Sequence, residues 1–155
     1  MKIMKISTIT AVIATILFSC GGKDPMTYNN SLMTIINDNE ASITKMNTAM
    51  STANYAEAEK IRKEWNANLT SQIKTVTDLG DYNGDAGLQQ GVLTGLKAYQ
   101  KIVAEDYPEL IAIRKDQRNE PAQESKLLDN INNTFETAAN AVNKAANDFE
   151  KKYSK

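Results

Sequence analysis

The feature that most constrains the fold of this chain is the spacing of apolar residues near its C-terminal end. Apolar side chains recur there at alternating steps of three and four residues, at Leu128, Ile131, Phe135, Ala138, Val142, Ala145 and Phe149. This spacing puts all seven on one face of an α-helix. It predicts an amphipathic helix, extended by Tyr153, that has to bury this face against other helices. The alanines in the pattern permit close helix approach.

A first earlier segment shows the same periodicity. It begins at Asp24, a candidate N-cap, followed by Pro25 at the first helical position, and it ends at residues 51–53. Asn39 lies on the apolar face as a polar exception. The apolar positions are Tyr28, Leu32, Ile35, Ile36, Ile43, Met46, Ala49 and Met50.

A second segment begins at Asn54, with Glu57 three residues later as in a capping box, and ends at Gly80, a favoured C-terminal cap. Its apolar face consists of Ala58, Ile61, Trp65, Leu69, Ile73, Val76 and Leu79. A loop rich in turn-forming residues, 80–87, follows it. Both ends of a helix are therefore well marked in the sequence.

A third segment contains a proline, Pro108, within an otherwise helical pattern. Its apolar positions are Leu88, Val92, Leu96, Tyr99, Val103, Tyr107, Leu110 and Ile111. Proline removes a backbone hydrogen bond, so it either kinks a helix or ends it. The alternative to a kink is a new helix capped by residues 106–109. The apolar stripe keeps its phase across Pro108, which favours a kink.

Four amphipathic segments with short connections predict an all-α fold. The simplest arrangement that buries all four faces is an antiparallel four-helix bundle with up-down-up-down topology. A three-helix array with one loose arm is the alternative. The bundle domain is expected to span residues 26–155.

The chain begins with a different kind of segment. Lys2 and Lys5 precede a run of 13 uncharged, mostly apolar residues, 6–18. A membrane-spanning helix needs about 20 such residues, so this run is too short for a permanent anchor. A basic start and a short apolar core are typical of a signal peptide, expected here over residues 1–19.

The end of this signal resembles the lipobox of bacterial lipoproteins, with Leu17, Ser19 and then Cys20, the only cysteine of the chain. The resemblance implies cleavage before Cys20 and attachment of acyl chains such as palmitate to its thiol and new amino group. Two or more acyl chains give a stable membrane anchor. The alternatives are a secreted protein with a spare thiol or an intracellular protein with a buried one. A lone cysteine also excludes an intramolecular disulfide.

Residues 20–25 form the expected lipidated cysteine and tether. Lys23 and Asp24 resemble, in short form, the signal that directs some Gram-negative lipoproteins to the outside of the outer membrane. The expected location is therefore the cell envelope, lipid-anchored at the outer membrane, with a surface-facing and a periplasm-facing position as the two alternatives. Beyond the signal the chain has 16 basic and 19 acidic residues, a net charge of −3 that gives no case for a nucleic-acid partner.

Three stretches are similar to those of a family of small bacterial surface lipoproteins of unknown function. They are YNNSLM at residues 28–33, GLKAYQKIVAEDYPELIAI at 95–113 and FEKKYSK at 149–155. This resemblance implies a helical bundle on a lipid tether and supplies no known active site.

Several chemistries lack their residues in this sequence. There is no histidine, which excludes histidine-containing zinc sites, di-iron sites and serine triads with a histidine base. No phosphate-binding glycine loop is present. The acidic residues Glu57, Glu59, Glu105, Asp106 and Glu109 have no partner that completes a mechanism. We therefore expect no catalytic residues, no metal site and no cofactor.

Methionine and aromatic residues leave two binding hypotheses. Met46 and Met50 lie four residues apart and could hold Cu(I), but methionine on an apolar face usually fills a core. Trp65, Tyr99 and Tyr107 could line a cleft between helices, or be ordinary core aromatics.

The sequence thus predicts a non-enzymatic envelope lipoprotein. Its partners would be the membrane, through Cys20, and an envelope or extracellular protein. The alternative is a carrier of a small apolar or aromatic ligand bound between helices near Trp65, Tyr99 and Tyr107.

Overall fold

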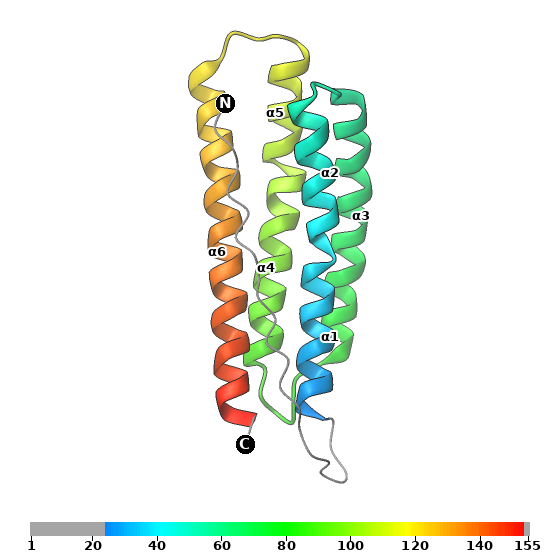
Figure 1. Ribbon diagram of the computed structural model, residues 1–155, viewed down its shortest axis with the longest axis vertical. Helices are drawn as coiled ribbons and strands as arrows, with labels where there is room; N and C mark the ends of the chain where they lie inside the picture. The colour runs from blue at the N-terminus through cyan, green and yellow to red at the C-terminus, as the bar shows by residue number, and fades with distance from the viewer. Residues whose placement is uncertain (1–23, 154–155) are drawn as a thin grey trace.

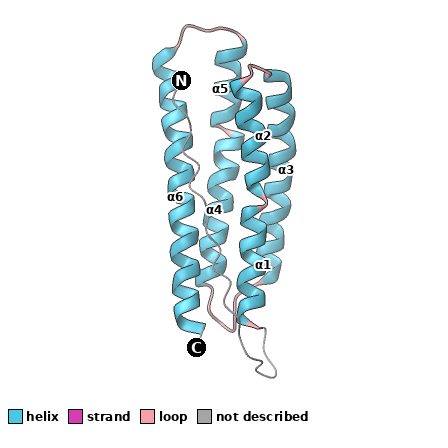
Figure 2. Ribbon diagram, in the orientation of Figure 1, coloured by secondary structure: helices cyan, strands magenta, loops and turns pink. Residues whose placement is uncertain are grey.

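The computed structural model describes residues 24–153, and this part of the chain is an all-α helical bundle (Figures 1 and 2). Its helices are α1 (Pro25–Asn37), α2 (Asn39–Ser51), α3 (Tyr55–Leu79), α4 (Gly87–Ala104), α5 (Asp106–Lys115) and α6 (Pro121–Tyr153). Among the described residues the only β-type pairing is an isolated bridge between Tyr82 and Asp85, in the loop before α4.

The six helices form four rods. The first rod is α1 with α2, the second is α3, the third is α4 with α5, and the fourth is α6. Figure 1 draws the first rod rising, α3 descending, the third rod rising and α6 descending. The start of α1, the loop between α3 and α4, and the end of α6 lie together at one end of the bundle, called here the tether end. The α2–α3 and α5–α6 connections lie at the other, the far end.

The caps predicted from the sequence are confirmed. The Asp24 carboxylate accepts a hydrogen bond from the Thr27 backbone N–H at 2.8 Å, and Pro25 is the first residue of α1. The Asn54 side chain accepts from the Glu57 N–H at 3.2 Å. Gly80 ends α3 with φ of +73°, a conformation that glycine adopts without strain.

The first rod is interrupted at Asp38, where the sequence predicts one continuous helix. The cause lies in the next residue. The Asn39 side-chain amide donates to the backbone carbonyl groups of Ile35 and Ile36, at 3.3 and 3.1 Å. These are acceptors that a regular helix would reserve for its own backbone, and such competition by asparagine side chains disrupts helices.

The third rod is also interrupted, but at Glu105 and not at Pro108 itself. Pro108 has no N–H for the carbonyl group of Ala104, where α4 ends. α5 begins two residues before the proline, and the two helices follow the same direction in Figure 1. The prediction of a kinked but unbroken helix is therefore wrong in detail, since one residue separates two helices.

The predicted apolar face of the third segment is confirmed at every position. All eight of its predicted residues, of which Leu88 is the first and Ile111 the last, are buried. α6 differs at its start. There Leu127 is buried while Leu128 is only half-buried, and Phe135 is half-buried as well. The heptad pattern predicts the helix correctly, but which residues are buried depends on the neighbouring helices.

α4 lies at the centre of the packing and makes its largest interface with α6, followed by α3. Two glycines of α4 permit this approach. A Cβ atom at Gly91 would lie 2.3 Å from the Ala145 Cβ atom, and one at Gly95 would lie 2.9 Å from a Val142 methyl group. Small residues on both helices thus bring the two backbones together, as the alanines of the α6 pattern suggested.

Candidate functional site

Cys20, the predicted lipidation site, lies outside the described residues. The description begins four residues later, at Asp24, which caps α1 at the tether end. The predicted tether, residues 20–25, therefore includes the cap and the first residue of α1.

The tether end is held together by an aromatic cluster. Tyr28, Tyr82, Phe149 and Tyr153 come from α1, the loop before α4, and α6, with neighbouring ring centroids 4.7–5.7 Å apart. The Tyr28 hydroxyl donates to the Gly80 carbonyl oxygen at 2.7 Å. The start of α1 is thus fixed to the end of α6 by packing.

A polar contact joins the same elements. The Asp85 carboxylate accepts from the Lys152 ammonium group at 2.6 Å, from the Tyr153 hydroxyl at 3.0 Å and from the Gly87 N–H at 2.9 Å. These donors, with the Lys152 hydrogen bond contributing most, lower the pKa of Asp85 to about 2. The sequence reasoning missed this contact, because Asp85 and Lys152 lie far apart in the chain.

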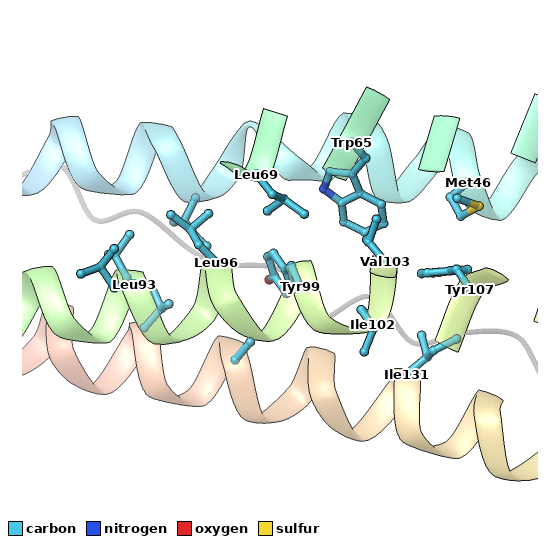
Figure 3. Packing of buried hydrophobic residues seen from close by; sticks show 14 of the residues in the cluster. Met46, Trp65, Leu69, Leu93, Leu96, Tyr99, Ile102, Val103, Tyr107 and Ile131 are labelled. Atoms are coloured by element: carbon cyan, nitrogen blue, oxygen red, sulfur yellow. The ribbon is translucent and has the colours of Figure 1, made fainter. Parts of the chain in front are cut away.

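The three predicted cleft residues lie together in the middle of the bundle (Figure 3). The Trp65 ring centroid is 6.4 Å from that of Tyr99 and 6.1 Å from that of Tyr107. Phe135 of α6 packs against the same group, 6.5 Å from Trp65 and nearly parallel to it. The three residues that the sequence identified thus come from three helices and form one aromatic cluster, to which α6 adds Phe135.

These residues are core residues in their exposure. Trp65 is 1 %, Tyr99 5 % and Tyr107 2 % exposed. Burial raises the pKa of Tyr107 far above its usual range, and burial together with the Glu40 carboxylate raises that of Tyr99. The Tyr107 hydroxyl has no hydrogen-bond partner among the described residues.

The Trp65 indole N–H donates to the Asn39 side-chain oxygen at 2.8 Å, and the Asn39 amide donates to the Gln72 side-chain oxygen at 3.0 Å. Asn39 is 2 % exposed. The sequence indicated this network through Asn39, the polar exception on the apolar face of the first segment. The sequence did not indicate its partners, which lie on α3.

Surface cavities of the described part include two that lie beside helices. One, of about 290 Å³, lies between the α1–α2 junction and α3. The other, of about 410 Å³, lies between the start of α4 and the end of α6. None of the three predicted cleft residues lines either cavity. The second contains Lys144 and Lys152, but each is paired with an acid, Asp148 or Asp85, at 2.5 and 2.6 Å.

Residues 24–153 contain no group of three or more acidic, histidine or cysteine side chains placed to hold a metal ion. Of the acidic residues considered in the sequence, Glu59 pairs with Arg62 at 2.7 Å, and Glu109 with Arg118 at 2.5 Å. Asp106 is 9 % exposed and accepts from the Asn130 amide at 2.7 Å, and burial raises its pKa. The first pair lies within α3, the second joins α5 to the loop that follows it, and only the Asp106–Asn130 contact joins two helices, α5 and α6.

No helix in the described range 24–153 has the length and apolar character needed to cross a membrane. Comparison of the chain with protein-family models, with curated proteins and with solved structures finds no match. The class that the fold itself defines is an all-α helical bundle.

Proposed function

We propose that this protein is a lipid-anchored module of the bacterial cell envelope, which acts by contacting another macromolecule and not by catalysis. The sequence supplies the anchor, Cys20 after a short signal peptide. The observation that carries the proposal is the position of Asp24, because the described bundle begins there, at one of its two ends.

This position determines how the body would stand on a membrane. Four residues of chain, from Cys20 to Asp24, span at most about 14 Å. The tether end would therefore face the bilayer closely. The 33 residues of α6 correspond to a length of about 50 Å, so the far end would project by that distance.

A firm tether end supports the same proposal. The aromatic cluster of Tyr28, Tyr82, Phe149 and Tyr153 and the Asp85–Lys152 pair connect α1 to α6 next to the anchor. A bundle held this way would present its far end and its sides as parts of one rigid body. An interaction module benefits from such rigidity because less conformational freedom is lost on binding.

The anchoring test is Cys20→Ser in the full-length protein, with membrane fractionation and mass spectrometry of the N-terminal peptide. We expect the wild type to be found in the membrane fraction with an acylated Cys20, and the variant to be lost from that fraction. As a matched control, Cys20→Ser/Ser154→Cys keeps one thiol but moves it to the other end of the chain, and it should behave like Cys20→Ser. Retention of either variant in membranes, to the wild-type extent, would refute the anchor.

The interaction role is tested separately. Wild-type protein is cross-linked in intact cells and recovered from detergent-solubilised membranes. We expect a discrete cross-linked species that is lost with Cys20→Ser, because the anchor brings the module to its partner. Recovery of the uncross-linked protein alone, over a range of reagents, would contradict the interaction role.

The alternative, a carrier of an apolar or aromatic ligand, has one observation in its favour, the unpartnered hydroxyl of Tyr107 beside Trp65. A ligand with a hydrogen-bond acceptor would satisfy this group, but only if the packed rings move apart. Native mass spectrometry of the purified protein tests this, because a carrier would retain a small molecule that Tyr107→Phe releases. A mass equal to that of the polypeptide with its acyl chains would remove this alternative.

A further inference from the structure

The cavity between the α1–α2 junction and α3 has an unusual lining for a helical bundle. Seven of its eight lining residues are polar, and their side chains carry amide, hydroxyl or carboxylate groups. The lining residues are Ile35, Asp38, Asn39, Ser42, Asn68, Ser71, Gln72 and Thr75. We call it the junction cleft.

The junction cleft lies where α1 ends and α2 begins, at Asp38. Asn39 forms its inner wall, and both polar atoms of the Asn39 side chain are hydrogen-bonded to other residues of the protein. The amide nitrogen donates to backbone carbonyls of α1 and to Gln72, and the oxygen accepts from Trp65. This buried network holds the break and fixes the orientation of Gln72.

Several groups of the outer wall remain available. The Gln72 oxygen is occupied by Asn39, so its NH₂ group keeps two free donors. The side chains of Asp38, Ser42, Asn68 and Ser71 make no hydrogen bond to another described residue. The cleft thus offers donors, acceptors and one carboxylate side by side, without a partner inside the described part of the protein.

The lining excludes several ligand classes. No lysine or arginine lines the cleft, so a phosphate or a carboxylate would meet Asp38 without a compensating cation. A single carboxylate is a poor site for a divalent ion, which prefers several oxygen ligands. The predominance of hydroxyl and amide groups disfavours an apolar ligand, which would leave them unpaired. A neutral, polar, hydroxyl-bearing molecule remains.

We infer that the junction cleft binds a neutral sugar residue, as a free monosaccharide or as part of a glycan. The Asp38 carboxylate can accept from sugar hydroxyls, the amides of Asn68 and Gln72 can donate and accept, and Ile35 offers the one apolar contact for the C–H face of a ring. The volume of about 290 Å³ lies just below the range of about 300–1,000 Å³ for drug-sized ligands, which suits a single sugar ring.

This inference gives the proposed interaction module a ligand class and rests on that proposed function. It does not depend on the anchor, because its test uses the purified full-length chain in detergent. A failed fractionation experiment and a failed binding experiment therefore remain distinguishable.

The experiment is a titration with glucose, mannose, galactose and N-acetylglucosamine, followed by NMR of the side-chain amide groups. We expect at least one sugar to shift the NH₂ signals of Asn68 and Gln72 saturably, with a Kd of about 1 mM, typical of a small ligand in an open site. Trp65, the only tryptophan, gives a second readout by fluorescence, since its N–H is bonded to Asn39 in the cleft wall.

The variant Asn68→Ala/Ser71→Ala removes two lining groups that are exposed and have no side-chain partner in the described part. Loss of two neutral hydrogen bonds should weaken sugar binding by about tenfold. Asn66→Ala is the matched control, because Asn66 lies on the same helix but does not line the cleft. Its Kd should equal that of the wild type.

A second comparison tests the role of charge. Glucuronate, the carboxylate form of glucose, should bind more weakly than glucose, and Asp38→Asn should reduce this difference. The inference is overturned if none of the four sugars shifts the Asn68 and Gln72 signals. It is equally overturned if the double variant binds as tightly as Asn66→Ala.

Discussion

Asn39 determines the structure around the α1–α2 junction and its contact with α3. It interrupts the first rod by bonding to the carbonyls of Ile35 and Ile36, and it satisfies the indole N–H of Trp65 in the core. A buried polar group of this kind is tolerated only when its hydrogen bonds are made, because an unpaired donor costs about 1–3 kcal/mol. The same side chain forms the inner wall of the junction cleft.

Removing this side chain should therefore be costly. Asn39→Ala leaves the Trp65 N–H without an acceptor, and we expect the free energy of unfolding, measured with urea, to fall by about 2 kcal/mol. Asn30→Ala is the control, since Asn30 is an exposed asparagine of the same rod, and its effect should stay within about 0.5 kcal/mol. Trp65→Phe should lower the free energy of unfolding less in the Asn39→Ala variant than in the wild type. Equal losses for the two asparagine variants would contradict this role.

Among the elements, α4 and α6 form the largest interface, and it depends on small residues in both helices. Gly91 lies over Ala145, and Gly95 lies over Val142. Glycine normally weakens a helix by about 1 kcal/mol relative to alanine. Its presence twice in α4 is explained by the closeness of α6, because a Cβ atom at Gly91 would meet an atom that cannot rotate away.

Gly91→Ala should thus destabilise the protein although alanine favours helices. The new methyl group would lie 2.3 Å from the Ala145 Cβ atom, and overpacking of this kind costs about 1–3 kcal/mol. We expect a net loss of about 1 kcal/mol or more in thermal or urea unfolding. Ala145→Gly makes room for the methyl group, so the double variant Gly91→Ala/Ala145→Gly should recover part of the loss. A stabilising effect of Gly91→Ala alone would show that the helices are further apart.

On the scale of the whole molecule, the tether end is where distant parts of the chain meet. α1, the loop before α4, and the last turn of α6 share the aromatic cluster of Tyr28, Tyr82, Phe149 and Tyr153. Asp85 adds a contact between the loop and Lys152. The far end has a pair of its own, Arg114 with Glu124 at 2.7 Å, which joins α5 to α6.

The Asp85 contact should make the stability of the tether end depend on pH. The pKa of Asp85 is about 2 in the folded protein, below its ordinary value of 3.8, so its contribution is complete above about pH 4 and is lost as the pH falls toward 2. Asp85→Asn should lower the stability at pH 7 by about 1 kcal/mol, since Lys152 is largely exposed to solvent. The difference from the wild type should shrink between pH 4 and pH 2.

The control for this prediction is Asp129→Asn, which changes the net charge equally on the exposed surface of α6. Subtracting its effect at each pH isolates the contribution of the Asp85 contact. Chemical unfolding at several pH values measures it. An Asp85→Asn effect that stays constant from pH 7 to pH 2 would show that the carboxylate charge plays no part in holding Lys152 and Tyr153.

Local periodicity was sufficient for the helices, their caps and most of the core. Steps of three and four residues predicted the apolar faces of all four rods, and Asp24, Asn54 and Gly80 marked the ends of helices. These features depend on neighbours within one or two turns, so the sequence contains them directly. The sequence likewise grouped Trp65, Tyr99 and Tyr107, because their positions on the stripes require them to face the core.

Only the tertiary structure decided the partners of Asn39 on α3, the Asp85–Lys152 contact and the junction cleft. Each of these depends on side chains from separate helices meeting in space, and periodicity within one helix says nothing about which neighbour it meets. The same limit explains why Leu127 replaces Leu128 in the core. The sequence by itself determined which faces are buried, and the packing of helix against helix determined what those faces form together.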